Sequence, residues 1–336
     1  MSDVAKIVSD IKNGNIKPIY FLMGEEPYYI DKISEYIETN ILSEEEKGFN
    51  QMVLYGRDVT IDEVVDNAKR FPMMAERQVI VVKEAQDLFR TIENLAAYAL
   101  NPQPSTVLVL CYKYKKIDKR KALYKAISKS GNGLVFESAK FYENQVPEWI
   151  NRVLAGKKYK IEPKANLMLV EFLGTNLSKI SNELDKLLVI LPAGSTITAK
   201  DIEENIGISK DYNNFELRKA VGARDVLKVN TIINYFGQNQ KANPLIMTIS
   251  LLNSFFTQLL IFHSLQDKSK NSAARALKVS PYFISDYVVA ARNYPMRKVS
   301  QVIGLLRDAD VKSKGVGANA LPAKDILKEL LFKIIH

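Results

Sequence analysis

The first residues with possible chemistry lie in the segment YFLMGEEPYYIDK, residues 20–32, where an apolar run leads into a helical pattern. A phosphate-binding loop at such a place needs several glycines, a lysine and a serine or threonine, because backbone N–H groups must wrap the phosphates. The segment has the single Gly24, followed by Glu25 and Glu26 at the predicted start of the helix. Carboxylates are stabilised at a helix N-terminus and repel a phosphate from it. The segment therefore has the position of a nucleotide site without its chemistry.

Histidine and cysteine are too rare to build the other common kinds of catalytic or metal site. The chain has two histidines, His263 and His336, and one cysteine, Cys111, so a histidine–cysteine metal site cannot be assembled. Cys111 follows the apolar run at residues 107–110 and is predicted to be a core thiol. We expect no catalytic residue, no metal and no cofactor. A single cysteine is also typical of the reducing cytoplasm.

Positive charge is concentrated in the last third of the chain. The 336 residues include 47 Lys and Arg against 38 Asp and Glu, a formal charge of +9. Residues 212–336 hold 18 basic and 8 acidic side chains, whereas residues 1–211 hold 29 and 30. A basic segment of this kind suits a polyanion such as nucleic acid, although a cationic soluble surface would have the same composition.

A second basic stretch, YKYKKIDKRKALYK at residues 112–125, interleaves tyrosines with seven Lys and Arg. Such interleaving suits a nucleic-acid backbone whose bases stack on the rings. The plainer interpretation, which we favour here, is a solvated loop and helix face with partly buried tyrosines. The residues kept as nucleic-acid candidates are Lys113, Lys115, Lys116, Lys119 and Arg120.

Strand and helix patterns alternate about five times in the first 140 residues. The β-branched run at residues 79–82 is typical of a strand buried on both faces, and a capping box at residues 60–63 marks the start of a helix. The alternation predicts a mostly parallel sheet with helices on both faces. Strand signals fade after residue 140. We therefore predict an α/β domain followed by two all-α domains, with ranges 1–140, 141–211 (small, helical) and 212–336 (basic, helical).

Membrane association is not expected from the sequence. The N-terminus has no basic segment followed by an apolar one, so it does not read as a signal peptide. The longest apolar stretch, at residues 245–265, is interrupted by eight polar side chains, which argues against a membrane span.

The segment FPMMAERQVIVV, residues 71–82, places bulky apolar side chains at the mouth of a predicted strand, where a polar loop is usual. Two interpretations are open from the residues. Either Phe71 and one methionine cover the sheet's own core, or the tip projects and contacts another molecule. The tip consists of Phe71, Pro72, Met73 and Met74.

Four stretches together resemble the delta subunit family of bacterial DNA polymerase III, the clamp-loader subunit that opens the sliding clamp. They are KPIYFLMGEEPYYIDKISEYI, FPMMAERQVIVVKEA, SPYFISDYVVAARNY and LLRDADVKSKG. The resemblance spans nearly the whole chain and implies an AAA+-like first domain without a working nucleotide site, a lid-like second domain and a third domain in a collar of loader subunits. It also implies that Met73 and Met74, flanked by Phe71 and Pro72, wedge into an apolar pocket of the clamp. The family more commonly has Leu-Phe or another Phe-containing pair there.

The resemblance implies function by binding rather than by catalysis. The chain would bind and open the sliding clamp for loading on primed DNA, without hydrolysing ATP itself. Its partners would be the clamp, the other loader subunits and primer–template DNA within the assembly. As part of the polymerase III complex it would be grouped with DNA-directed DNA polymerase, a nucleotidyltransferase. The residues leave two alternatives open, a stand-alone DNA- or RNA-binding protein and a nucleotide hydrolase with an atypical loop.

Overall fold

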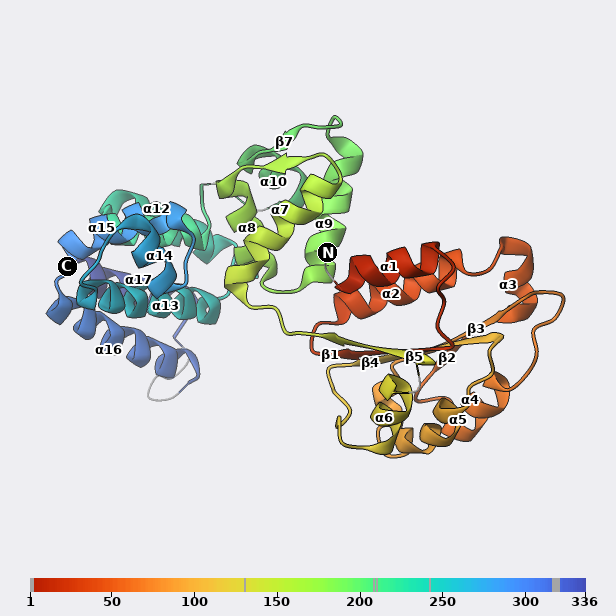
Figure 1. Ribbon diagram of the computed structural model, residues 1–336. Coiled ribbons are helices and arrows are strands. Elements are labelled where there is room, and N and C mark those ends of the chain that lie inside the picture. The colour runs from red at the N-terminus through yellow and green to blue at the C-terminus, as the bar shows by residue number, and fades with distance from the viewer. Residues whose placement is uncertain (1–2, 130, 208, 210, 242, 316–320) are drawn as a thin grey trace. The chain divides into compact units, whose positions relative to one another are not determined.

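The computed structural model describes residues 3–129, 131–207, 209, 211–241, 243–315 and 321–336. The chain divides into two compact units, Met1–Phe141 and Tyr142–His336, which Figure 1 draws in the colours of the sequence. The boundary between the units lies beside the domain boundary expected at residue 140. The further division expected at residue 211 falls inside the second unit and stays a prediction.

A five-stranded parallel sheet forms the centre of the first unit, with the strand order β2-β3-β4-β1-β5. Strands β3 and β4 consist of almost uninterrupted buried apolar residues because helices cover both faces of the sheet. The predicted α/β fold with a mostly parallel sheet, followed by helices, is confirmed. The strands are β1 (Ile19–Gly24), β2 (Gln51–Tyr55), β3 (Gln78–Lys83), β4 (Thr106–Lys113) and β5 (Gly133–Ser138).

Successive strand residues point to opposite faces, so the sheet separates two cores. Tyr20 and Leu22 pack with helices α1 and α2 on one face, while Phe21 and Met23 pack with α4, α5 and α6 on the other. Figure 1 shows the two helical layers on either side of the strands. The helices described in this unit are α1 (Asp3–Lys12), α2 (Pro27–Asn40), α3 (Glu44–Asn50), α4 (Ile61–Ala68), η1 (Ala85–Leu88), η2 (Ile92–Leu95), α5 (Ala96–Leu100) and α6 (Ala122–Lys129).

The second unit is helical apart from one short pair of parallel strands, β6 (Lys160–Ile161) and β7 (Thr196–Ile197). These two-residue strands depart from the expected all-α composition, because two residues are too few to produce a periodic pattern in the sequence. The helices described in this unit are η3 (Glu143–Gln145), α7 (Val146–Gly156), α8 (Pro163–Leu173), α9 (Leu177–Ile190), α10 (Ala199–Ile206), α11 (Asn214–Ala223), α12 (Val226–Gln238), α13 (Leu245–Ser264), α14 (Lys270–Leu277), η4 (Pro281–Phe283), α15 (Ile284–Asn293), α16 (Met296–Ser313) and α17 (Ala323–Ile335).

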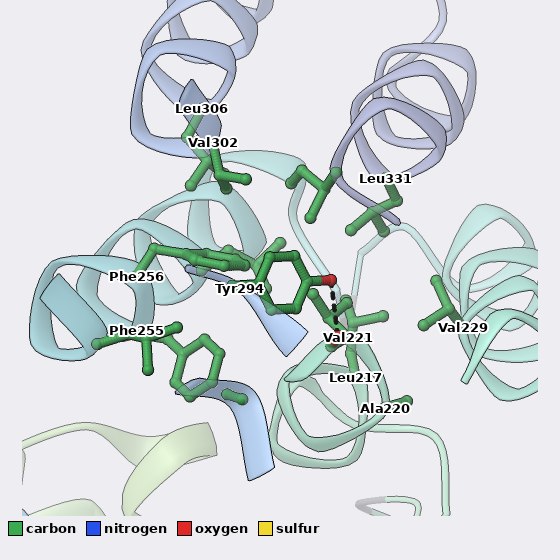
Figure 2. Packing of buried hydrophobic residues seen from close by; sticks show 14 of the residues in the cluster. Leu217, Ala220, Val221, Val229, Phe255, Phe256, Tyr294, Val302, Leu306 and Leu331 are labelled. Atoms are coloured by element: carbon green, nitrogen blue, oxygen red, sulfur yellow. Dashed lines mark hydrogen bonds between the residues drawn. The ribbon is translucent and has the colours of Figure 1, made fainter. Parts of the chain in front are cut away.

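Aromatic and aliphatic side chains from α11, α13, α16 and α17 meet in one core, shown in Figure 2. Tyr294 lies in its middle, beside Phe256, with the two ring centroids 5.2 Å apart. The buried Tyr294 hydroxyl donates a hydrogen bond to the backbone oxygen of Val221 at 2.9 Å. Burial raises the pKa of Tyr294 to about 12, so the hydroxyl keeps its proton and its hydrogen bond at physiological pH.

Helix α13 is the one helix among the described residues that has the length and apolar composition of a membrane span. One of its faces is buried in the core through Leu252, Phe255, Phe256 and Leu259. This spacing of three and four residues is that of a helix face packed against neighbouring helices. Packing of this face in the helical core accounts for part of the apolar composition of α13.

Candidate functional site

The loop at residues 69–77 joins α4 to β3 and lies at the N-terminal end of that strand. Phe71 is 78% exposed, Met73 is 63% exposed and Met74 is fully exposed, while Pro72 is half-buried. None of the three exposed side chains covers the sheet, so the interpretation in which Phe71 and one methionine cap the core does not fit. Three large apolar side chains at one loop tip are instead typical of a contact surface.

The two ends of the loop are held together by Gln78, the first residue of β3. Its side-chain Nε2 lies 2.6 Å from the backbone oxygen of Arg70 and 2.8 Å from the hydroxyl oxygen of Thr106. The Thr106 hydroxyl in turn donates to the backbone oxygen of Ala68, at the end of α4, at 2.8 Å. These bonds fix the point at which the chain leaves α4 and the point at which it enters the sheet.

The tip itself is held by Asn50, the last residue of α3, whose side chain is buried. The Asn50 Oδ1 accepts a hydrogen bond from the Met73 N–H at 2.7 Å, and its Nδ2 donates to the Met73 oxygen at 2.9 Å. The same Nδ2 also donates to the backbone oxygen of Glu46 at 3.1 Å. Asn50 therefore satisfies both backbone groups of Met73 and anchors them to α3.

Met74 adopts a left-handed backbone conformation, with φ at 52°. For a residue with a side chain this conformation costs about 1 kcal/mol or more, and such residues persist where their surroundings determine the geometry. Here the hydrogen bonds between the Asn50 side chain and the Met73 backbone fix the geometry of the chain next to Met74. The loop therefore presents Met73 and Met74 in a fixed arrangement before any partner binds.

Asn50→Ala is expected to loosen this tip. The substitution removes both bonds to Met73, and hydrogen bonds of this kind contribute about 1 kcal/mol each, so the unfolding free energy should fall by about 1–2 kcal/mol. We expect amide hydrogen exchange at Met73 to become at least tenfold faster, because the local opening that exposes this N–H becomes easier. Asn40→Ala is the matched control, since the Asn40 amide donates within its own helix, to the Tyr36 oxygen. Unchanged exchange at Met73 in Asn50→Ala would contradict the role assigned to Asn50.

At the junction of β1 and α2, where a phosphate-binding loop would lie, two backbone donors are used within the unit. The Gly24 N–H donates to the Lys115 oxygen at 3.2 Å, and the Glu25 N–H donates to the Ser138 oxygen at 3.0 Å. The Glu26 carboxylate caps α2 by accepting from the Tyr28 N–H at 2.9 Å. Burial raises the pKa of Glu26, an effect that this hydrogen bond opposes. A carboxylate thus occupies the helix N-terminus at which a nucleotide phosphate would bind.

The basic stretch that begins at the end of β4 is largely paired with carboxylates. Lys113 Nζ lies 2.8 Å from Asp31 and 2.9 Å from Glu84. Burial lowers the pKa of Lys113, but these two carboxylates outweigh burial and leave it raised. The ammonium group of Lys113 is therefore held inside the protein as one member of a charged triad.

The other candidates in this stretch are arranged similarly. Lys116 and Lys119 both lie 2.9 Å from Glu137, and Arg120 lies 2.7 Å from Asp118. Lys115 lies over the Phe89 ring at 4.1 Å. Of the tyrosines, Tyr112 is buried and Tyr114 is exposed. This pairing favours a charge-compensated surface, and the contact of these five residues with nucleic acid stays a prediction.

Catalytic and metal chemistry is not suggested by the part of the chain that the structure describes. There, no group of three or more His, Cys, Asp or Glu side chains is placed to hold a metal ion. Cys111 is enclosed in the sheet, and burial raises the pKa of its thiol to about 12. A thiol with such a pKa is protonated at neutral pH and is a poor nucleophile.

Comparisons with known proteins agree on one family. The model of the family described as DNA polymerase III, delta subunit, matches residues 20–137. The chain is 25% identical over 321 residues to DNA polymerase III subunit delta of Bacillus subtilis (strain 168), covering 93% of this chain and 92% of that one. The solved structure of a Bacillus subtilis DNA clamp loader delta protein matches 99% of both chains, with a TM-score of 0.57 and 23% identity. The last match shows a shared fold along the whole chain.

Proposed function

We propose that this chain, which is similar to DNA polymerase III delta subunits, is a member of that family, and that it binds the sliding clamp and opens it without hydrolysing ATP itself. The observation that carries the proposal is the outward-facing tip with Met73 and Met74 exposed. Methionine is unbranched and adaptable, so two adjacent methionines suit an apolar pocket in the way that the family's more common Leu-Phe pair would.

Such a tip opens a ring by differential binding, which means that it binds the open ring more tightly than the closed ring. A closed and an open ring are two states, and a ligand shifts their populations only by its difference in affinity for the two. A tip that fills an apolar pocket next to a subunit interface, and fits the open form better, stabilises that form. Burying one methionine side chain contributes about 1.5–3 kcal/mol, and the part of this free energy that the tip gains with the open ring but not with the closed ring is what shifts the equilibrium. The fixed loop lowers the entropy lost on binding.

The segment between β1 and α2 supports function without nucleotide hydrolysis. The backbone donors of Gly24 and Glu25 are used within the unit, and Glu26 caps the helix. A bound triphosphate would have to displace these bonds and approach two carboxylates. In this proposal nucleotide binding by other loader subunits controls when the tip is presented.

The second unit serves assembly in this proposal. Its C-terminal helices, residues 212–336, would join the other clamp-loader subunits in a collar, and their excess of ten positive charges would lie near primer–template DNA. A protein with this function would be located in the cytoplasm. The chain would be grouped with DNA-directed DNA polymerase only as part of the polymerase III complex.

The proposal is tested with the isolated chain and the sliding clamp of the same organism. The clamp carries a donor and an acceptor dye on either side of one subunit interface. We expect saturable binding in the absence of ATP, accompanied by a fall in energy transfer as the interface separates. Absence of binding would refute clamp recognition, and binding with unchanged energy transfer would refute opening.

Two control measurements separate this function from the alternatives. ATP turnover by the isolated chain would support a nucleotide hydrolase. Tight nucleic-acid binding by the isolated chain, with a salt dependence that corresponds to several phosphates, would support a stand-alone DNA- or RNA-binding protein. The proposed function predicts neither result.

A further inference from the structure

Phe49 is an exposed aromatic residue that lies outside the loop at residues 69–77. It lies in the last turn of α3, immediately before Asn50, and 78% of its surface is accessible to solvent. A side chain in that position adds little to the stability of the unit's own core. Short as it is, α3 is a well-defined helix, because Ser43 and Glu46 form a capping box at its start. The orientation of Phe49 is therefore set by a formed helix.

The segment that carries Phe49 is bonded directly to the loop tip. Asn50 follows Phe49 in the chain, and its side chain holds both backbone groups of Met73. Phe49 is consequently one residue away from the residue that positions the methionine pair. These two segments, separated by more than twenty residues in sequence, are joined by the hydrogen bonds between Asn50 and Met73, next to the first residues of β2 and β3.

Four apolar side chains on these segments define a surface, which we call the apolar tip surface. They are Phe49, Phe71, Met73 and Met74. Each of the four side chains is at least 63% exposed, and exposed apolar side chains on neighbouring segments often mark an interaction surface. Exposed charged residues border it on α3 and on the loop, among them Glu45, Lys69, Arg70 and Glu76, as is usual for the polar rim of an interface.

We infer that Phe49 is a third anchor of the clamp-binding surface and contacts the same molecule as Met73 and Met74. The inference rests on the proposed function, because the clamp is the partner assigned to the methionine pair. A specific interface buries about 800 Å² on each partner, which is more than the loop tip alone offers. A clamp seated on Met73 and Met74 must therefore extend over neighbouring surface, and the end of α3 is the neighbour bonded to the tip.

The test compares the clamp affinities of Phe49→Ala, Phe49→Leu and the unsubstituted chain in one titration. We expect Phe49→Ala to weaken binding at least fivefold and Phe49→Leu to recover most of the loss, because leucine again fills an apolar pocket. The matched control is Phe89→Ala. Phe89 is also a partly exposed phenylalanine of the first unit, but it follows β3 and so lies at the opposite end of the sheet. Its substitution should leave clamp affinity unchanged.

The outcomes distinguish this inference from the function on which it rests. If Met73→Ala with Met74→Ala weakens binding and Phe49→Ala does not, the third anchor is refuted and the proposed function stands. If the unsubstituted chain does not bind the clamp, the proposed function itself fails. An equal loss for Phe49→Ala and Phe89→Ala would also overturn the inference, since it would reflect a general effect of removing a ring. Unfolding curves of each variant establish that the first unit remains folded.

Discussion

Replacing Met73 and Met74 together with alanine is expected to weaken binding to the sliding clamp at least tenfold, which corresponds to about 1.4 kcal/mol. The reason is the loss of two apolar anchors, and the few residues that dominate an interface commonly contribute about 2 kcal/mol or more each. The fold should be unaffected, because both side chains are exposed and Asn50 bonds to the backbone of Met73 rather than to its side chain. Fluorescence titration against labelled clamp measures the change in dissociation constant.

Two controls make this result specific. Met296→Ala removes another exposed methionine, at the start of α16 in the second unit, and should bind the clamp normally. Met73→Leu with Met74→Leu keeps apolar volume at the tip and should retain most of the affinity. A double alanine variant with unchanged affinity, and with an unchanged unfolding curve, would show that the clamp binds elsewhere on the chain.

Gly24→Ala is expected to lower the unfolding free energy of the first unit by about 3 kcal/mol or more, since backbone strain and forced overlap each cost about 1–3 kcal/mol. Gly24 has a φ of 133°, which side chains rarely tolerate, and a Cβ at this position would lie 2.0 Å from the Ser138 oxygen. The strand pairing of β1 with β5 and the bond from the Glu25 N–H to Ser138 leave that oxygen little room to move. Urea unfolding followed by circular dichroism measures the loss.

Gly48→Ala is the control for this substitution. Gly48 lies in α3, and a Cβ there would meet nothing within 4 Å. Alanine is the better helix former by about 1 kcal/mol, so this variant should be as stable as the unsubstituted chain or more stable. A Gly24→Ala variant of normal stability would mean that the turn after β1 is less closely packed on β5 than the structure shows.

The sheet of the first unit could be predicted from the sequence because each strand is marked locally. The run at residues 79–82 is β-branched throughout, and it forms the centre of β3 between two cores. The capping box predicted at residues 60–63 is present, with the Thr60 hydroxyl and the Glu63 carboxylate each accepting a backbone N–H. Both signals involve residues within three or four positions of one another, so they can be recognised in a single sequence.

The support of the loop could not be predicted, because it depends on contacts between distant segments. Asn50 meets Met73 across 23 residues, and an isolated asparagine before a strand gives no sign of such a partner. The apolar tip was visible as an unusual composition at residues 71–74, but its exposure was not decided by the sequence. Phe49, an aromatic residue in the acidic segment EEEKGFN, is a local sequence signal of the same kind, because a bulky apolar side chain stands among polar ones.

The basic stretch shows the same limit. Its sequence displays the lysines together, whereas most of their partners come from elsewhere: Asp31 in α2, Glu84 after β3 and Glu137 in β5. A count of charge along this stretch alone therefore leaves out the carboxylates that the fold places beside it. The fold brings the compensating carboxylates to the same edge of the sheet, where parallel strands end.

The enclosure of Cys111 has a practical consequence for site-directed labelling. The chain has no other cysteine, and this thiol is 1% exposed with a pKa raised to about 12, so maleimide reagents will leave the folded protein essentially unmodified. A thiol introduced by Pro72→Cys would be the sole reactive group. A spin label or a dye can therefore be attached to the loop without first substituting Cys111 in the sheet.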